Sequence, residues 1–469
     1  MVVGNFVEDV DTVVIGSGPG GYVAAIHAAQ QGQKVVIIEK DNIGGICLNE
    51  GCIPSKALIS VGKDVYKSRN ETAFGLTYEG STLDFKKMQE WKNTEVVHLL
   101  TSGIEALLKK YKIEIVEGTA NFSSSSSISV VRGDEYLGFH FKHAIIATGS
   151  SPIELPDFKF NEDILDSTGL LNIEELPKSL AVIGGGYIGM ELAFALSDLG
   201  SDVTVIESLD RVLSGFEEDL TKPVLKAAEE KNITIITNAK AKDYEKENNE
   251  LVLTYEKDGE LKTLSTEKIA VVVGRSPNTE DLSLSMAGIE LTKSGHIKVD
   301  DYGETSAKNI YAIGDVVLGP ALAHKASYEA KMVVERIGGN KGAAIDYLVI
   351  PTVCYTSPEI AVVGLTFDEA KKEGLKPKKA IYHFKNNGRA LSTGETEGFV
   401  RLISDSETKR LVGAQLVGAN VDDLINYLTL AIENLLTIED VALTIHSHPS
   451  LSETILDASE IILGKPTHQ

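Results

Sequence analysis

The sequence has few cysteines, little positive charge and no long apolar run. Three cysteines in 469 residues are too few for a secreted disulfide framework. Every apolar run is shorter than the roughly 18 to 20 residues that cross a bilayer, so no membrane-spanning segment is expected. The 45 Lys and Arg residues face 68 Asp and Glu, a formal net charge of −23, which disfavours nucleic acids and anionic membranes as partners. The acidic N-terminus MVVGNFVEDV does not resemble a targeting peptide, which predicts a cytoplasmic location.

A pattern of strand, glycine turn, helix and strand occurs twice. The first copy covers residues 11–15, 16–21, 22–30 and 34–38, and the second covers residues 180–183, 184–189, 190–199 and 202–206. Each copy ends in an acidic residue, Glu39 or Glu207. This order is typical of a dinucleotide-binding unit, so the sequence predicts two such modules in an α/β protein.

The glycines of both turns follow the spacing G-x-G-x-x-G. The first makes the tight turn, the second admits a pyrophosphate and the third lets the helix pack on the strand. The six positions are Gly16, Gly18, Gly21, Gly184, Gly186 and Gly189. A carboxylate at Glu207 accepts hydrogen bonds from ribose hydroxyls and repels a 2′-phosphate, which favours NAD over NADP, although Arg211 lies close by in the sequence.

The remaining chain shows three boundaries and one polar turn. NFSSSSS at residues 121–127 is typical of a turn between strands. Boundaries are expected after ATGSSP, after VVVGRSPNT and near residues 347–351, beyond which strands and then a helix over residues 422–434 are predicted.

Two of the three cysteines lie five positions apart in CLNEGC. Pro54 suits the first turn of a helix, so Cys52 is expected near the positive end of a helix, where a thiolate is stabilised. Lys56 lies on the same helical face and adds positive charge. The alternatives are two buried thiols or half of a metal site, but no neighbouring Cys or His completes a metal site. Cys354, alone in PTVCYT, is predicted to be a core residue.

Five motifs occur in order along nearly the whole chain: GSGPGG, GGICLNEGCIPSK, GGGYIGME, YAIGD and HSHPSLSE. With these motifs the sequence resembles the flavin-dependent disulfide reductases, and most closely those that oxidise dihydrolipoamide with NAD⁺. The resemblance implies an FAD-binding domain, an NAD-binding domain, a central domain that completes the FAD site and a C-terminal α+β dimerisation domain. Their expected limits are residues 1–150, 151–279, 280–349 and 350–469.

The resemblance also implies the cofactor-binding residues. For FAD these are Glu39 at the adenosine ribose, Thr148 and Gly149 at the border, Asp315 at the ribityl chain, and Ala120 and Ala323 through their backbones. For NAD they are Gly184, Gly185, Gly186, Tyr187, Ile188, Gly189, Glu207, Ala241 and Gly274. Lys56 is expected to pair with Glu191 near the flavin, where an ion pair tunes its reactivity. The sequence departs from the family pattern at Ile46, Ser276 and Ser450.

The implied reaction uses a Cys47–Cys52 disulfide. A substrate thiolate attacks Cys47, and Cys52 then faces the flavin. His448 is the candidate base that deprotonates the substrate, oriented by Glu453, and both come from the other subunit of a homodimer. The neighbouring His446 is expected to be structural.

The implied partners are protein domains. They are a lipoyl domain as substrate and the small basic subunit-binding domain of an acyltransferase in a 2-oxo acid dehydrogenase complex, with Glu433 as one candidate contact. Alternatives in the same family are glutathione or mercuric reductases. Glu207 argues against the first, and a missing C-terminal cysteine pair argues against the second. A non-catalytic thiol sensor or structural subunit is the alternative from another class.

Overall fold

The first glycine-rich module is built around strand β1 (Val7–Ile15), helix α1 (Pro19–Gln30) and strand β2 (Val35–Glu39). The computed structural model describes residues 7–70, 74–133, 135–248 and 250–468. β1 extends further towards the N-terminus than expected because its exposed first residues still pair with a long neighbouring strand. α1 also begins earlier, at Pro19, since proline suits the first helical turn.

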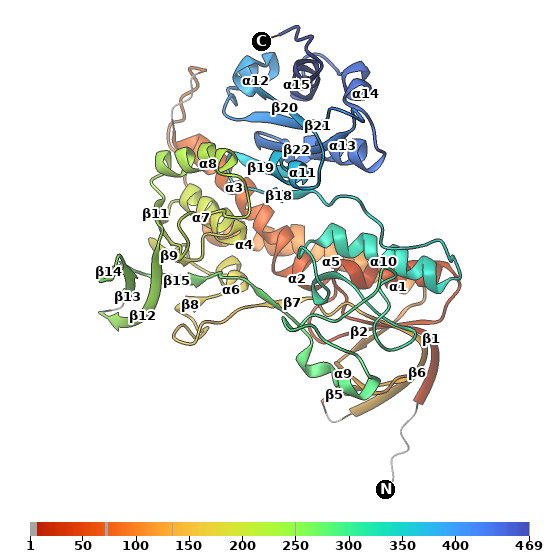
Figure 1. The fold of residues 1–469 in the computed structure, drawn as a ribbon. Helices are drawn as coiled ribbons and strands as arrows, with labels where there is room; N and C mark the ends of the chain where they lie inside the picture. Colours follow the sequence, from red (N-terminus) through yellow and green to blue (C-terminus); the bar gives the residue numbers. More distant parts are fainter. Residues whose placement is uncertain (1–6, 71–73, 134, 249, 469) are drawn as a thin grey trace.

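This module forms a seven-stranded sheet in the order β3-β2-β1-β6-β5-β4, with β17 also paired to β6. The other strands are β3 (Glu114–Glu117), β4 (Thr119–Ser124), β5 (Ser127–Arg132), β6 (Glu135–Ile146) and β17 (Ile310–Ala312). Of the serine-rich run, Ser125 and Ser126 form the predicted turn between β4 and β5, whereas residues 121–124 belong to β4 and Ser127 begins β5. β17 runs parallel to β6, so the chain returns to the first sheet after the second module (Figure 1).

The second module is a five-stranded parallel sheet in the order β11-β10-β9-β15-β8. Its elements are β8 (Ile164–Leu165), α6 (Ser167–Leu171), β9 (Ser179–Ile183), α7 (Tyr187–Leu199), β10 (Asp202–Ile206), α8 (Glu218–Glu230), β11 (Thr234–Ile236) and β15 (Lys268–Val271). An antiparallel meander adds β12 (Ala239–Glu247), β13 (Glu250–Lys257) and β14 (Glu260–Thr266). A short ladder of β7 (Ser150–Pro152) and β16 (Arg275–Pro277) joins the two modules.

The C-terminal part is an antiparallel sheet in the order β18-β19-β22-β21-β20, packed with helices. Its strands are β18 (Thr352–Cys354), β19 (Glu359–Gly364), β20 (Pro377–His383), β21 (Phe399–Asp405) and β22 (Leu411–Gly418). Its helices are α11 (Phe367–Lys372), α12 (Gly388–Thr393), α13 (Val421–Glu433), α14 (Ile438–Leu443) and α15 (Glu453–Leu463). The buried Arg401 pairs with Glu217 and Asp219, which ties this sheet to the second module.

Helix α3 (Cys52–Arg69) connects all three parts, and the short helix α2 (Gly45–Asn49) precedes it. α3 packs closely on α7, since a Cβ at Gly62 would lie 3.1 Å from the carbonyl oxygen of Ala195. Cys354 is fully buried in the core shared by α3, α7 and the C-terminal strands, as predicted. Figure 1 shows α3 running between the second module and the C-terminal part.

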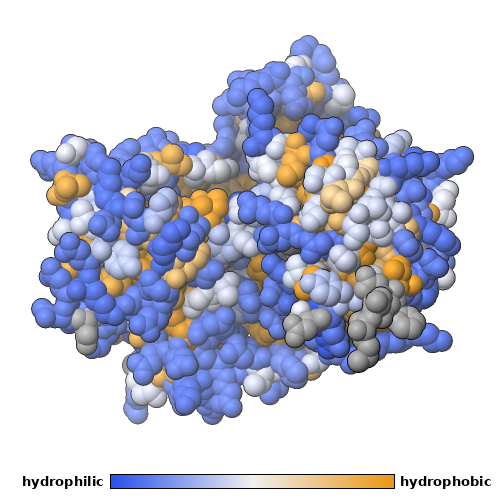
Figure 2. Space-filling model, turned by 90° about the horizontal axis from the view of Figure 1, so that it is seen from below, coloured by the Kyte–Doolittle hydropathy of each residue, from blue (hydrophilic) through white to orange (hydrophobic). Residues whose placement is uncertain are grey.

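The remaining helices cover the first sheet, connect the modules or, in one case, pack in the C-terminal part. They are α4 (Phe85–Trp91), the π-helix η1 (Lys92–His98), α5 (Leu99–Lys110), η2 (Glu280–Leu282), α9 (Leu284–Ala287), η3 (Gly314–Val316), α10 (Ala323–Ile337) and η4 (Phe384–Asn386). None of the helices in the described residues is long and apolar enough to cross a membrane. Hydrophilic residues dominate the face in Figure 2. The predicted fold class, two dinucleotide-binding modules with a C-terminal α+β part, is confirmed.

Candidate active site

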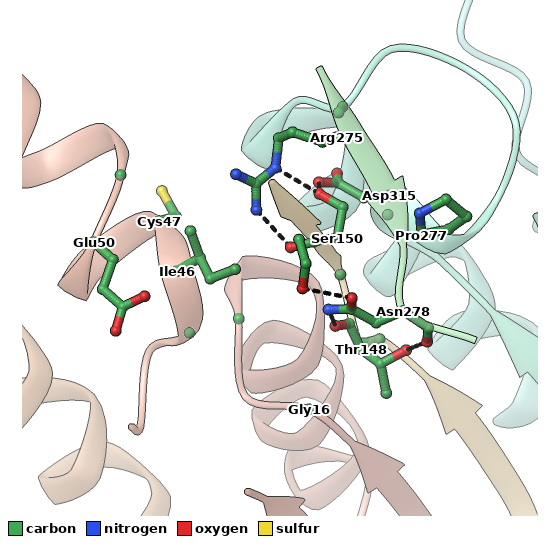
Figure 3. Close-up of a pocket in the computed structure, with 18 of the residues that line it drawn as sticks. Gly16, Ile46, Cys47, Glu50, Thr148, Ser150, Arg275, Pro277, Asn278 and Asp315 are labelled. Carbon is green, nitrogen blue, oxygen red and sulfur yellow. Dashed lines mark hydrogen bonds between the residues drawn. The ribbon is translucent and has the colours of Figure 1, made fainter. Parts of the chain in front are cut away.

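A cavity of about 960 Å³ lies between the first module, the β7/β16 ladder and η3 (Figure 3). Many of the predicted site residues line it: Gly16, Gly18, Glu39, Cys47, Cys52, Lys56, Ala120, Thr148, Gly149, Tyr187, Ile188, Glu191, Asp315 and Ala323. The other predicted residues lie outside its wall: Gly21, Gly184, Gly185, Gly186, Gly189, Glu207, Ala241, Gly274, His448 and Glu453. The cavity therefore contains the redox pair and most of the first glycine turn. Of the second turn, Tyr187 and Ile188 reach the cavity wall and the glycines lie outside it.

The first glycine turn leaves open space only at its middle glycine. A Cβ at Gly21 would lie 1.9 Å from the Gly16 carbonyl oxygen, so α1 requires glycine there to pack on the turn. A Cβ at Gly18 would meet no protein atom within 4 Å. Gly18 is also the N-cap of α1 and brings no side-chain cap, so the first N–H groups of the helix remain available to an anion. This cradle fits a pyrophosphate.

The second turn repeats this geometry. A Cβ at Gly189 would lie 2.0 Å from the Gly184 carbonyl oxygen, whereas one at Gly186 would meet nothing within 4 Å. Gly186 is the N-cap of α7, again without a side-chain cap. The two copies of the sequence repeat therefore leave the same open space at their middle glycine, and the second turn also fits a pyrophosphate.

The two acidic residues turn back onto their glycine turns in the same way. Glu39 Oε2 accepts hydrogen bonds from the N–H and Oγ of Ser17, at 2.8 and 2.6 Å. Glu207 Oε2 accepts the N–H of Gly185 at 2.7 Å. Arg211, which left the choice of nucleotide open, donates its guanidinium hydrogens to the carbonyl oxygens of Ser214 and Phe216. These two hydrogen bonds hold the guanidinium within its own loop, which favours NAD at Glu207.

Asp315 is fixed in the cavity wall by groups from distant segments. Its Oδ2 accepts the Ser150 hydroxyl at 2.6 Å, and Ser150 Oγ accepts Arg275 Nε at 2.8 Å (Figure 3). The preceding Gly314 is held on both sides, because its N–H donates to Glu329 Oε2 at 2.7 Å and its carbonyl accepts Lys325 Nζ at 3.1 Å.

Thr148 and Gly149 lie where the β7/β16 ladder begins. Thr148 Oγ1 donates to the carbonyl oxygen of Asn278 at 2.8 Å, and the Asn278 amide donates back to the Thr148 carbonyl at 2.9 Å. Gly149 accepts the Asn278 N–H at 2.9 Å. Ser276 pairs with Ser151 in the ladder. The joint between the two modules is therefore a closed network at the border of the cavity.

Cys47 and Cys52 are two free thiols that share a hydrogen bond in the cavity wall. Cys52 is the first residue of α3, as predicted. The hydrogen bond from Cys47 and the charge of Lys56 lower the pKa of Cys52 to about 7 against the opposing effect of burial. The same hydrogen bond, with burial, raises the pKa of Cys47. Both shifts favour Cys52 over Cys47 as the thiolate when the pair is reduced.

An ion pair lies beside these thiols. Lys56 Nζ is 2.7 Å from Glu191 Oε2, and Glu191 is nearly buried on α7. Glu191 Oε1 accepts the N–H of Tyr355 at 2.9 Å, and Lys56 Nζ lies 4.4 Å from the centre of the Tyr355 ring. Nothing in the sequence near Tyr355 pointed to this contact, which joins residues far apart in the chain.

His448 and Glu453 form a second group outside the cavity. His448 Nδ1 lies 2.9 Å from Glu453 Oε1, and Glu453 Oε2 accepts the Ser450 N–H at 2.8 Å. The His448 side chain is 81% exposed, so its Nε2 edge faces outward. Burial works to raise the pKa of Glu453, but the Ser450 and His448 hydrogen bonds outweigh it, and the pKa is lowered. His446 instead bonds the Thr444 carbonyl and packs edge-on against Tyr427.

The remaining predicted positions are backbone sites or departures from the motifs. Ala120 is buried on β4, and Ala323 is the first residue of α10. Ala241 lies on β12 away from the cavity, and the carbonyl of Gly274 accepts the Ile153 N–H at 3.0 Å. Ile46 lines the cavity beside Cys47.

Two nucleotide modules, a shared cavity and a dithiol pair beside a lysine define an oxidoreductase that couples flavin and pyridine nucleotide to thiol chemistry. Sequence comparison agrees with this class. The chain belongs to the pyridine nucleotide-disulphide oxidoreductase family, whose model matches residues 10–330, and the dimerisation domain of that family matches residues 350–459. FAD and NAD are its cofactors, and the dimerisation domain indicates a homodimer.

Curated relatives cover the whole chain. It is 50% identical to the dihydrolipoyl dehydrogenase of Geobacillus stearothermophilus, over 100% of this chain and 99% of that protein. It is 49% identical to the dihydrolipoyl dehydrogenase of Staphylococcus aureus over the full length of both. Among solved structures, LpdA of Mycobacterium tuberculosis matches with a TM-score of 0.90 at 26% identity, covering 96% of this chain and 99% of that one.

Proposed function

We propose that this chain is a dihydrolipoyl dehydrogenase, which oxidises protein-bound dihydrolipoyl groups to lipoyl groups and reduces NAD⁺ to NADH. The observation that carries this proposal is the dithiol pair in the cavity wall, with Cys52 prepared as a thiolate beside Lys56. The whole-length dihydrolipoyl dehydrogenase relatives support it. Glu207 and the engaged Arg211 support NAD as the electron acceptor.

The thiol chemistry starts from the oxidised pair. A substrate thiolate attacks Cys47 Sγ, the Cys47–Cys52 bond breaks, and Cys52 leaves as the thiolate that Lys56 stabilises. The second substrate thiol loses its proton and attacks the substrate sulfur of the mixed disulfide, which closes the lipoyl disulfide and expels Cys47. The pair has then gained two electrons, and the substrate has lost two electrons and two protons.

His448 is the proposed base that takes the proton of the attacking thiol, and the expelled Cys47 thiolate takes up the proton of the second thiol. An imidazole suits proton transfer near neutral pH, and the Glu453 carboxylate orients its Nδ1 side and stabilises the imidazolium. Because His448 lies outside the cavity and is exposed on the C-terminal part, we infer that it serves the cavity of the partner subunit.

The cofactor sites follow from the two glycine turns. A bound FAD would supply two-electron transfer between the cysteine pair and NAD⁺. We assign its pyrophosphate to the turn at Gly18, its adenosine ribose to Glu39 and its ribityl chain to Asp315, and we assign the NAD pyrophosphate to the turn at Gly186. We infer that residues 1–150, 151–279, 280–349 and 350–469 act as FAD-binding, NAD-binding, central and dimerisation domains; the pairing of β17 with β6 supports the third.

Subunit mixing tests the shared site. Cys52→Ser and His448→Gln dimers are each expected to lose dihydrolipoamide turnover while retaining FAD. Equal amounts of the two variants are unfolded to subunits and reassembled. In each mixed dimer, one site combines the unchanged Cys52 of one chain with the unchanged His448 of the other, so about a quarter of the wild-type activity should return. Failure to recover activity, with mixed dimers verified by mass, would refute a base supplied by the partner. Undiminished turnover by the His448→Gln dimer would refute the base itself.

We also propose that the chain serves a 2-oxo acid dehydrogenase complex. The substrate would be a lipoyl domain, and docking would use the small basic subunit-binding domain of an acyltransferase. The net charge of −23 supports a basic partner. Glu433 stays a candidate for this contact through Oε2, since its Oε1 accepts the Val349 N–H at 2.8 Å. Docking measured between low and high salt should weaken steadily, and a salt-independent affinity would contradict the electrostatic explanation.

A further inference from the structure

Tyr355 contacts both members of the ion pair beside the redox cysteines. Its backbone N–H donates to Glu191 Oε1 at 2.9 Å, and its ring lies 4.4 Å from Lys56 Nζ. Glu191 Oε2 receives Lys56 Nζ at 2.7 Å. Each oxygen of the carboxylate therefore has one donor, and the ammonium group has a carboxylate and a ring face as neighbours.

The backbone at Tyr355 is held by its neighbours in the chain, and its partly buried side chain packs against the core shared by α3 and α7. Cys354 and Thr356, on either side of it, are fully buried, and Thr356 Oγ1 donates to the Pro358 carbonyl at 2.7 Å. Burial raises the pKa of the Tyr355 hydroxyl to about 12, so the side chain is neutral at physiological pH. The attraction for Lys56 therefore comes from the negative face of the ring rather than from a phenolate.

We propose that Tyr355 is a positioning residue that holds the Lys56 ammonium group beside Cys52, so that the dimerisation domain stabilises the charge of the redox centre in its own chain. A lysine side chain on a helix samples several rotamers, and a salt bridge alone leaves much of that freedom. The Tyr355 ring face gives Nζ a second contact besides Glu191, which narrows the positions open to the ammonium group. This inference rests on the redox role proposed for Cys52.

The test measures the Cys52 thiolate directly. A Cys47→Ser background leaves Cys52 as the single cavity thiol and keeps a hydroxyl donor next to it. In this holoenzyme the thiolate-to-flavin charge-transfer band is recorded against pH, with Tyr, Phe, Leu or pentafluorophenylalanine at position 355. Tyr355→Phe is the matched control, because it keeps the ring and removes only the hydroxyl. Pentafluorophenylalanine keeps the ring shape but reverses the charge of the ring face. It therefore tests the same contact if the Tyr355→Leu protein does not fold.

The Tyr and Phe proteins should titrate together. In the Leu and pentafluorophenylalanine proteins, the pKa of Cys52 should be about half a unit higher. This is the size expected when a cation–π contact is lost from a partly exposed lysine. Titration of all four proteins at the same pH would overturn the inference, as would a Phe protein that behaves like the Leu or pentafluorophenylalanine protein. Absence of the band in the Tyr protein at every pH would instead contradict the redox role of Cys52.

Discussion

Two glycines of the second turn, Gly186 at the cap of α7 and Gly189 within α7, predict different outcomes for alanine substitution. At Gly186 the backbone has φ −70° and ψ 179°, which alanine adopts without strain, and the new Cβ meets no protein atom within 4 Å. The fold should therefore be unchanged. The methyl group would instead occupy the space assigned to the NAD pyrophosphate and displace it from the first N–H groups of the helix.

The magnitude follows from the contacts that would be lost. One or two hydrogen bonds to a charged group are worth about 1.5 to 3 kcal/mol each. Even one such loss raises the KM for NAD⁺ by about 10- to 100-fold. Gly189→Ala differs in kind, because its Cβ would lie 2.0 Å from the Gly184 carbonyl oxygen and would push α7, which carries Glu191, off the turn. That variant should lose thermal stability as well as NAD⁺ binding.

The assay compares the two variants with wild type. Steady-state KM for NAD⁺, FAD content and the thermal midpoint are measured on each. Gly186→Ala should change only the KM for NAD⁺. Gly189→Ala should change both this KM and the thermal midpoint. An unchanged KM for Gly186→Ala would refute the placement of the pyrophosphate at this turn, and a Gly189→Ala protein as stable as wild type would refute the packing argument.

Three further outcomes are expected. In the two-electron-reduced enzyme the thiolate of Cys52 should be present above pH of about 7 and lost below it, since its pKa lies at about 7; a charge-transfer band independent of pH between 5 and 9 would contradict this. Glu453→Gln should lower turnover of dihydrolipoamide about tenfold, by removing the charge that stabilises the imidazolium, and leave NADH oxidation by an artificial dye unchanged; equal losses in both assays would point to a general defect. Glu329→Gln leaves the buried Lys325 without its charged partner and holds Gly314 less firmly. The variant should lose about 3 kcal/mol of unfolding free energy and release FAD faster. FAD release at the wild-type rate would show that the Lys325–Glu329 pair does not position Asp315.

Local patterns predicted the elements that depend on local sequence. β10 has the expected limits because an apolar run stands between a turn and a terminal glutamate, and α3 begins at Cys52 because Pro54 favours the first helical turn. β1 and α1 were predicted too short, since the exposed residues of β1 and the turn residues of α1 carry no apolar pattern.

Contacts between distant segments could not be predicted in this way. Ser150, Arg275 and Asp315 meet across more than a hundred residues of chain, and each lies in a motif that gives no sign of the other two. Tyr355 is similar, because its apolar surroundings predict a strand but not a lysine above its ring. Such contacts arise only when the two modules and the C-terminal sheet have packed together.

The carboxylate of Glu191 belongs to α7 of the second module, yet its two oxygens bind Lys56 of α3 and the backbone of Tyr355. Consider a chimera in which one module comes from a distant relative. The new module would bring its own nucleotide turn, but its residues would still have to fit the contacts of Glu191 with the other two parts. Exchange of modules by recombination is therefore constrained here more than at the cofactor turns, and positions 56, 191 and 355 should vary together among relatives.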